Sequence, residues 1–315
     1  MLDFLLVVVM AAAAGPVLAP VKTWSAPAQP IEVRVQADQP VQLVLTDFTG
    51  KPLQGGSPAA SQPVDAGRPL DVKTMFPPLA TPGTYLLYTV PVGKTAADFV
   101  GTPLVVQVRA DNRPGAPAGP VAVKVEPLRY AVAHTDKGDV TMAFYYDVAP
   151  NTADAFLDLA AGGYFEGITF HRIVPGFVIQ GGDPRGDGTG GPGYRLPPEF
   201  SNRPHVRGTL SMARQGDPEE GPRVPPRYEF ASSAGSQFFI CLDYAKTQQL
   251  DGRYTVFGKV TDGMDTVDKI AATPLADHRT GKPAEPQVIR KVDVVEVTPG
   301  KNPYATLFAE IGAGR

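Results

Sequence analysis

The chain has 315 residues, a formal net charge of −3 at pH 7 and one cysteine. The slight acidity gives no reason to expect binding to nucleic acid or to an anionic membrane. A lone thiol excludes an internal disulfide, and the four histidines have no ligand-like spacing, so we expect no metal site and interpret the histidines as structural. The length suits two domains, and the 33 glycines and 34 prolines indicate many turns between short strands.

The chain opens with an apolar run, residues 4–14, which is too short to span a bilayer and has the length of a signal-peptide core. Small residues follow it, as a cleavage site requires, although Met1-Leu2-Asp3 lacks the usual positive charge. A buried strand or helix is the alternative. We interpret residues 1–20 as a signal peptide or a retained membrane anchor, which predicts an extracytoplasmic location, periplasmic or secreted.

Residues 26–110 are predicted to form a small β-sandwich of immunoglobulin-like type. Its strands are indicated by β-branched or aromatic runs between glycine and proline turn signals, at residues 31–35, 41–45, 85–90 and 104–109. No cluster of polar residues there points to catalysis. We interpret this domain as a spacer or docking module, and recognition of a partner in the cell envelope is the alternative.

Residues 111–122 are rich in proline, glycine and alanine and predict a semi-rigid linker, because such a stretch cannot bury apolar surface. Beyond it, runs at 130–134 and 140–146 read as two strands of a hairpin whose turn uses Gly138 for its positive φ.

Two helices are predicted in the remainder of the chain. Asn151 or Thr152 would cap the first, which ends at Gly162-Gly163, and the second spans residues 264–271. Each carries an apolar stripe at the helical period: Ala153, Phe156, Leu157 and Ala160 in the first, and Met264, Val267, Ile270 and Ala271 in the second.

The most informative segment is residues 170–184, with the sequence Phe-His-Arg-Ile-Val-Pro-Gly-Phe-Val-Ile-Gln-Gly-Gly-Asp-Pro. It places Arg172 and Gln180 beside an apolar run, residues 177–179. Such a site can hold a neutral, planar group, because the apolar wall removes water and the donors fix the orientation of the group. A strict two-residue turn would put Gln180 on the opposite face from Arg172, so a bulge or a wider loop is needed if both serve one site.

This segment resembles the signature of the cyclophilin family of peptidyl-prolyl cis-trans isomerases. Four further blocks occur in the family's order, at residues 208–213, 235–241, 250–252 and 256–260. Several separated motifs in order are more specific than any short pattern. The resemblance covers residues 128–298 and implies a mainly β protein, with a closed eight-stranded antiparallel barrel and two capping helices. Residues 299–315 are then a C-terminal tail.

The resemblance also implies a peptidyl-prolyl isomerase that needs no cofactor and acts on proline-containing polypeptides, aiding the folding of exported proteins. Arg172 would be the catalytic residue. The implied substrate-binding residues are Phe177, Val178, Gln180, Ala213, Arg214, Gln237, Phe239, Leu250 and Tyr254. The alternative is a scaffold or holdase that binds proline peptides with little turnover.

Little transition-state stabilisation is required for this reaction. Raising the rate from ~0.01 s⁻¹ to ~10 s⁻¹ needs only about 4 kcal/mol. In the twisted amide the nitrogen regains its lone pair. A charged donor at that nitrogen therefore binds the transition state better than either planar ground state.

Several positions depart from the best-known pattern of the family. Val178 stands where many members have methionine, and Tyr254 where many have histidine. Arg214 replaces an asparagine that contacts the substrate backbone, and its charge and five donors would alter the residues preferred around proline. Gln249 replaces a tryptophan, which predicts weak binding of cyclosporin-type inhibitors.

Between Ala213 and Ser232 the chain carries more residues than the family's usual short loop, including residues 218–231. A long loop beside a groove is either a specificity element or a tolerated surface insertion. The sequence leaves both interpretations open.

Overall fold

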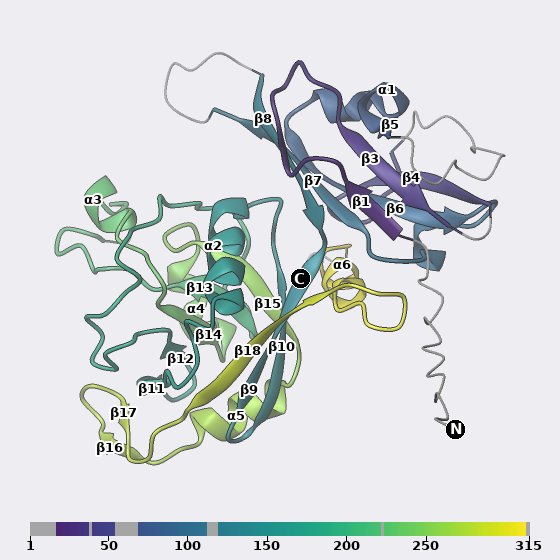
Figure 1. Ribbon diagram of the computed structural model, residues 1–315. Coiled ribbons are helices and arrows are strands. Elements are labelled where there is room, and N and C mark those ends of the chain that lie inside the picture. Colours follow the sequence, from purple (N-terminus) through teal and green to yellow (C-terminus); the bar gives the residue numbers. More distant parts are fainter. Residues whose placement is uncertain (1–16, 38–39, 54–68, 112–118, 222–223, 313–315) are drawn as a thin grey trace, which may run out of the picture. The chain divides into compact units, whose positions relative to one another are not determined.

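The computed structural model describes residues 17–37, 40–53, 69–111, 119–221 and 224–312 (Figure 1). The chain divides into two compact units, one within Met1–Leu128 with Thr298–Gly300, the other within Arg129–Val297 and Lys301–Arg315. The apolar run at residues 4–14 lies outside the described residues. Within the described ranges, no helix has the length and apolar character needed to cross a membrane.

The N-terminal unit consists of two antiparallel sheets that share one apolar core, with strand orders β1-β3-β5 and β2-β8-β7-β6-β4. In β3, Val33 and Val35 are buried while Arg34 and Gln36 are exposed, the alternation of a strand with one face on a core. The two sheets agree with the predicted sandwich, and its immunoglobulin-like type stays a prediction. The elements are β1 (Val17–Pro20), β2 (Trp24–Ser25), β3 (Glu32–Gln36), β4 (Val41–Asp47), β5 (Leu70–Asp71), α1 (Val72–Met75), η1 (Pro77–Ala80), β6 (Gly83–Pro91), η2 (Ala96–Asp98), β7 (Leu104–Ala110) and β8 (Pro120–Pro127).

Two boundaries of this unit differ from the prediction. Residues 17–20, assigned to the leader, form β1, which pairs with β3 and buries Leu18 in the core. Residues 120–122, assigned to the linker, begin β8, which pairs with both β2 and β7. Valines at every second position of β8 carry a strand pattern that the preceding proline-rich composition obscured. The boundary between the units therefore falls after Leu128.

The C-terminal unit is built on one eight-stranded antiparallel sheet, in the order β11-β12-β14-β13-β15-β10-β9-β18. A two-residue turn joins β9 to β10, with Gly138 at φ 130°, as predicted. The strands are β9 (Arg129–Thr135), β10 (Gly138–Phe144), β11 (Arg172–Val174), β12 (Val178–Gly181), β13 (Thr209–Met212), β14 (Phe238–Cys241), β15 (Val256–Asp262) and β18 (Ile289–Glu296), with a separate pair β16 (Leu275–Asp277) and β17 (Lys282–Pro283).

The sheet curls so that the segments preceding its two end strands meet. The Gly167 N–H donates to the Ile289 carbonyl (2.9 Å) and the Phe170 N–H to the Gln287 carbonyl (2.8 Å). In the described residues, the end strands β11 and β18 themselves share no ladder. The mainly β, eight-stranded architecture is thus as predicted, while complete closure of a barrel stays a prediction.

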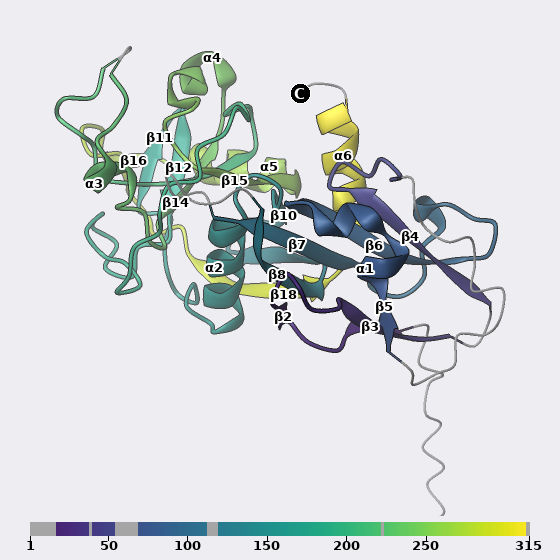
Figure 2. The same cartoon turned by 90° about the horizontal axis from the view of Figure 1, so that it is seen from above.

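Both predicted helices are present, as α2 (Pro150–Ala161) and α5 (Met264–Ala271), and α2 packs beside β18 (Figures 1 and 2). Their predicted apolar stripes face the core, apart from Met264 and Ala271, which are only half-buried. The predicted cap of α2 is wrong, because Pro150 starts the helix and places Asn151 and Thr152 inside its first turn. The carboxylate of Glu199 caps the helix instead, accepting from the Asn151 N–H (3.1 Å) and the Thr152 N–H (2.8 Å).

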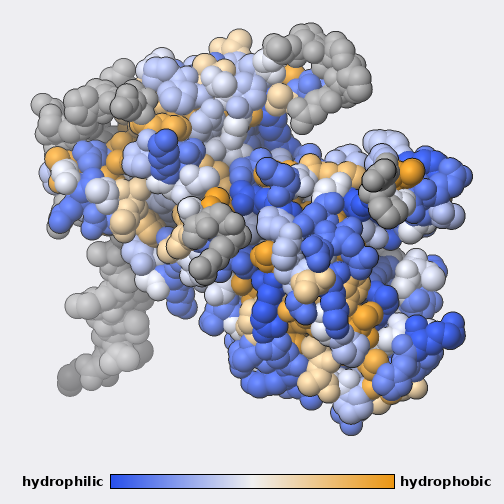
Figure 3. Space-filling view, turned by 180° about the vertical axis from the view of Figure 1, so that it is seen from behind, coloured by the Kyte–Doolittle hydropathy of each residue, from blue (hydrophilic) through white to orange (hydrophobic). Residues whose placement is uncertain are grey.

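The segment predicted as a C-terminal tail contains a helix, α6 (Tyr304–Gly312), which buries Tyr304 and Leu307. The Tyr304 hydroxyl donates to the Arg129 carbonyl (2.7 Å) and accepts from the Phe144 N–H (3.2 Å). Shorter helices are α3 (Tyr228–Ala231), α4 (Tyr244–Thr247) and η3 (Gln248–Leu250). On the face seen in Figure 3, apolar residues form only small, separate patches among polar ones, consistent with burial of most apolar side chains.

Candidate active site

The turn between β11 and β12 has three residues, Pro175-Gly176-Phe177, with Gly176 at φ 67°. Val174 pairs with Val178, so Arg172 pairs directly with Gln180 and both side chains lie on one face of the sheet. An N–H of the Arg172 guanidinium donates to the Gln180 side-chain oxygen (3.3 Å). The three-residue turn is the wider loop expected if Arg172 and Gln180 serve one site.

The side chain of Gln180 is part of a chain of amide hydrogen bonds. Its side-chain nitrogen donates to the Gln237 oxygen (3.0 Å), and the Gln237 nitrogen donates to the carbonyls of Gly188 (3.0 Å) and Gly190 (2.9 Å). Asp183 holds this glycine-rich loop by accepting the Arg185 N–H (2.8 Å). The orientation of Arg172 is therefore set by Gln180, Gln237 and the loop behind them.

Arg172 and Gln180 border a cavity of about 160 Å³. Beneath it, Val178 and Phe239 are almost fully buried, and the Tyr254 ring stands edge-on to Phe239 with ring centroids 5.8 Å apart. The remaining lining residues are Phe177, Ala213, Arg214 and Leu250. The structure thus brings nine of the ten predicted site residues around one cavity, and places the tenth, Gln237, behind Gln180.

A wider groove of about 580 Å³ adjoins this cavity and shares Gln180, Ala213 and Arg214 with it. Its other walls are the glycine-rich loop after Asp183 and the segment from Ser233 to Gln237. The cavity is suited to one compact apolar ring, and the groove to an extended chain on one side of that ring.

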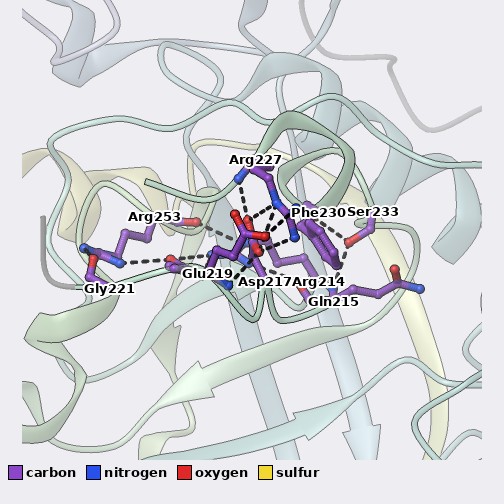
Figure 4. Close-up of polar contacts among 10 residues, drawn as sticks. Arg214, Gln215, Asp217, Glu219, Gly221, Arg227, Phe230, Ser233 and Arg253 are labelled. Atoms are coloured by element: carbon purple, nitrogen blue, oxygen red, sulfur yellow. Dashed lines mark hydrogen bonds and ion pairs between the residues drawn. The ribbon is translucent and has the colours of Figure 1, made fainter. Parts of the chain in front are cut away.

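Arg214 does not lie in the site as a free cation. Its side chain is 2% exposed, and its guanidinium carbon lies 4.2 Å from the centroid of the Tyr254 ring. All three of its guanidinium nitrogens donate within the protein: Nε to the Arg253 carbonyl and one terminal nitrogen to the Gln215 carbonyl (Figure 4), and the other terminal nitrogen to Glu220. Arg214 lines the cavity as predicted, but its charge and donors are engaged within the protein, so an effect on the residues preferred around proline would come from the wall it forms.

Sequence reasoning missed the contribution of His205, which lies fully buried behind the cavity with its ring stacked on Phe239. Its Nδ1 is 2.8 Å from an Asp251 carboxylate oxygen, and its Nε2 is 3.0 Å from the Ser211 hydroxyl. Because Ser211 is also fully buried, this group is structural and not a nucleophile with its base. Burial lowers the pKa of His205, against the opposing effect of Asp251, so the folded state disfavours protonation of the ring.

We expect His205 to make the folded state less stable in acid. The unfolded histidine gains its proton near pH ~6.5 while the buried one resists it, so the free energy of unfolding should fall as the pH is lowered from about 7.5 to about 5.5. Urea unfolding at both pH values checks this. His205→Asn can still donate to Asp251 but does not titrate, and it should show a weaker pH dependence. An equal dependence in both proteins would contradict the assignment.

A guanidinium with unused donors, Arg172, beside a cavity with an apolar floor, on a curled sheet of antiparallel strands, defines a site for holding and polarising a planar group. Residues 130–294, a little over half of the chain, match the family described as cyclophilin type peptidyl-prolyl cis-trans isomerase/CLD, and the chain belongs to this family. All matched residues lie within the C-terminal unit.

Two relatives agree with this assignment in sequence, and one solved structure is also similar to part of the chain. A peptidyl-prolyl cis-trans isomerase of Synechococcus elongatus is 43% identical over 135 residues, which are 43% of this chain and 82% of that protein. The peptidyl-prolyl cis-trans isomerase-like 3 protein of Gallus gallus is 37% identical over 177 residues, 55% of this chain and 96% of that protein. A crystal structure of a Cryptosporidium parvum cyclophilin type peptidyl-prolyl cis-trans isomerase is 30% identical, with a TM-score of 0.47, and covers 54% of this chain and 98% of that one.

Proposed function

We propose that the cavity of the C-terminal unit binds the proline ring of a polypeptide and that Arg172 accelerates rotation about the preceding peptide bond. The observation that carries this proposal is the pairing of Arg172 with Gln180, which holds a cation on the same face as the apolar cavity. In the described contacts, Gln180 uses only one N–H of Arg172, which leaves donors for a substrate.

The chemistry follows from the change in the amide during rotation. The planar amide nitrogen is a poor acceptor, whereas the nitrogen of the twisted amide carries a localised lone pair that accepts a hydrogen bond. A guanidinium donor beside that nitrogen is thus bound more strongly in the transition state than in either ground state. Beside the buried apolar side chains of Val178 and Phe239, one charge-assisted bond supplies much of the ~4 kcal/mol required. No covalent intermediate is involved.

A protease-coupled assay of the purified full-length chain on an Ala-Pro peptide tests this function. Enzymatic turnover is expected. Saturable binding of the peptide without turnover would instead favour the scaffold or holdase. The Arg172→Ala variant separates these outcomes most clearly, because an enzyme loses turnover with it and a pure binder has none to lose.

We further propose that the substrates are exported polypeptides that fold outside the cytoplasm, with the N-terminal unit docking to a partner in the envelope. The support is the apolar run at residues 4–14. Because β1 begins at Val17, a cleaved leader has to end before that residue if the three-stranded sheet is to keep its first strand. Mass spectrometry of the mature N-terminus tests the export, and a start at Met1 in cells would count against cleavage.

Weak binding of cyclosporin-type inhibitors is also part of this proposal. Gln249 lies on a shallow groove that shares Phe177 with the site, and it has no aromatic face to offer an apolar ligand. Inhibition of turnover at micromolar cyclosporin or below would contradict it.

A further inference from the structure

The insertion between Ala213 and Ser232 is held by two separate groups of ion pairs (Figure 4). In the first, Glu220 accepts from Arg214 and from Arg253. In the second, Asp217 accepts from Arg227, which also pairs with Glu219. Only the first group contains a residue that lines the cavity, and this residue is Arg214.

Glu220 sits between two guanidiniums with little access to water. Both of its carboxylate oxygens lie 2.8 Å from one terminal nitrogen of Arg214, and one oxygen lies 3.0 Å from Arg253. The side chain of Glu220 is 14% exposed, that of Arg214 2% and that of Arg253 21%. Such pairs are poorly screened by salt, and removal of one partner leaves a buried charge without its counter-ion.

The position of Arg214 depends on this carboxylate. Two of the four hydrogen bonds made by its guanidinium go to Glu220, and the carbon of the same guanidinium lies 4.2 Å from the centroid of the Tyr254 ring. A long side chain without those two bonds regains rotamer freedom and no longer presents a fixed surface. Both Arg214 and Tyr254 line the cavity, so a loss of order there enlarges and hydrates the proposed proline site.

We propose that Glu220 is a positioning residue for peptide binding. From the insertion it fixes Arg214 against Tyr254 and thereby shapes one wall of the cavity, which makes the insertion a specificity element. This inference rests on the proposed function. Because the wall contacts the substrate equally in its planar and twisted forms, loss of Glu220 weakens binding without removing the catalytic donor.

Steady-state kinetics of the full-length chain test this assignment. Glu220→Gln should raise KM for a proline peptide about tenfold and leave kcat within about twofold. Glu219→Gln is the matched control, since it removes the same charge from the next residue, whose side chain is 70% exposed and pairs only with Arg227 in the described contacts. It should leave KM unchanged, and Glu220→Asp, which keeps the charge, should restore part of the affinity.

A double-mutant cycle with Arg214→Met distinguishes positioning from general loop stability. If Glu220 acts through Arg214, adding Glu220→Gln to Arg214→Met raises KM no further. If the single variant Glu220→Gln fails to fold, the double variant can be measured in its place. In the double variant Arg214 is methionine, so the buried Arg214 cation is not left without its counter-ion. A wild-type chain without isomerase activity would refute the proposed function. If the wild type is active, an unchanged KM in Glu220→Gln would refute this inference alone. Additive effects of the two substitutions in the double-mutant cycle would refute it as well.

Discussion

Replacing Arg172 with alanine is expected to lower kcat/KM for an Ala-Pro peptide by about 10²- to 10³-fold. The variant removes the guanidinium that pairs with Gln180 at the edge of the cavity and leaves the apolar lining in place. Because that lining is proposed to hold the proline ring in both planar isomers, peptide binding should persist while turnover is lost. A protease-coupled assay gives the rate, and fluorescence titration with a labelled proline peptide gives the affinity.

A conservative variant and a control variant test whether the effect is specific to the Arg172 guanidinium. Arg172→Lys keeps the charge but loses the planar fork that reaches both Gln180 and a substrate nitrogen, so it should recover only part of the activity. Arg290→Ala removes another arginine of the same unit, one whose side chain is 64% exposed and paired with Asp136 on the surface. It should behave as the wild type. Activity of Arg172→Ala within about fivefold of wild type would show that this guanidinium is not the catalytic donor.

Replacing Tyr304 with alanine is expected to destabilise the C-terminal unit by about 3–5 kcal/mol. The ring is fully buried beneath α6, and its hydroxyl bridges the Arg129 carbonyl and the Phe144 N–H. Tyr304→Phe keeps the ring and loses only the two hydrogen bonds, so about 1–2 kcal/mol is expected. Comparison of Tyr304→Ala with Tyr304→Phe separates the contribution of ring packing to stability from that of the two hydrogen bonds.

Urea unfolding measures these losses with an internal reference. The single tryptophan, Trp24, belongs to the N-terminal unit, so its fluorescence reports that unit while isomerase activity and near-ultraviolet circular dichroism report the other. Tyr228→Ala, at a side chain on α3 that is 69% exposed, should change neither transition. A loss below about 1 kcal/mol in Tyr304→Ala would mean that α6 contributes little to the fold.

Local patterns were sufficient for several parts of the fold. The helix at residues 264–271 appears with the predicted bounds, because its apolar stripe repeats at the helical period. Gly138 directly follows the predicted hairpin turn and closes it by pairing with Thr135, at a φ of 130° that few other residues tolerate. Such features depend on residues close together in the sequence, which sequence patterns describe well.

Features that depend on distant partners were not predictable in the same way. The cap of α2 comes from Glu199, 47 residues beyond Thr152, whereas the local sequence indicated Asn151 or Thr152. The helix α6 is short, and it is stabilised by burial of Tyr304 against β9 and β10. Strand β8 follows a proline-rich stretch, and pairing with β2 and β7 outweighs that composition.

The candidate site also has one part that sequence patterns indicate and another part that depends on distant partners. The sequence alone determined its chemistry, since the order of motifs selected Arg172, Gln180 and the apolar residues that the structure gathers around one cavity. Only the tertiary structure decided the state of Arg214, for which the sequence indicated a charge and five donors but no partner. Its carboxylate partner Glu220 lies on an insertion whose path no local pattern describes, and burial beside that partner turns a mobile charge into a fixed wall.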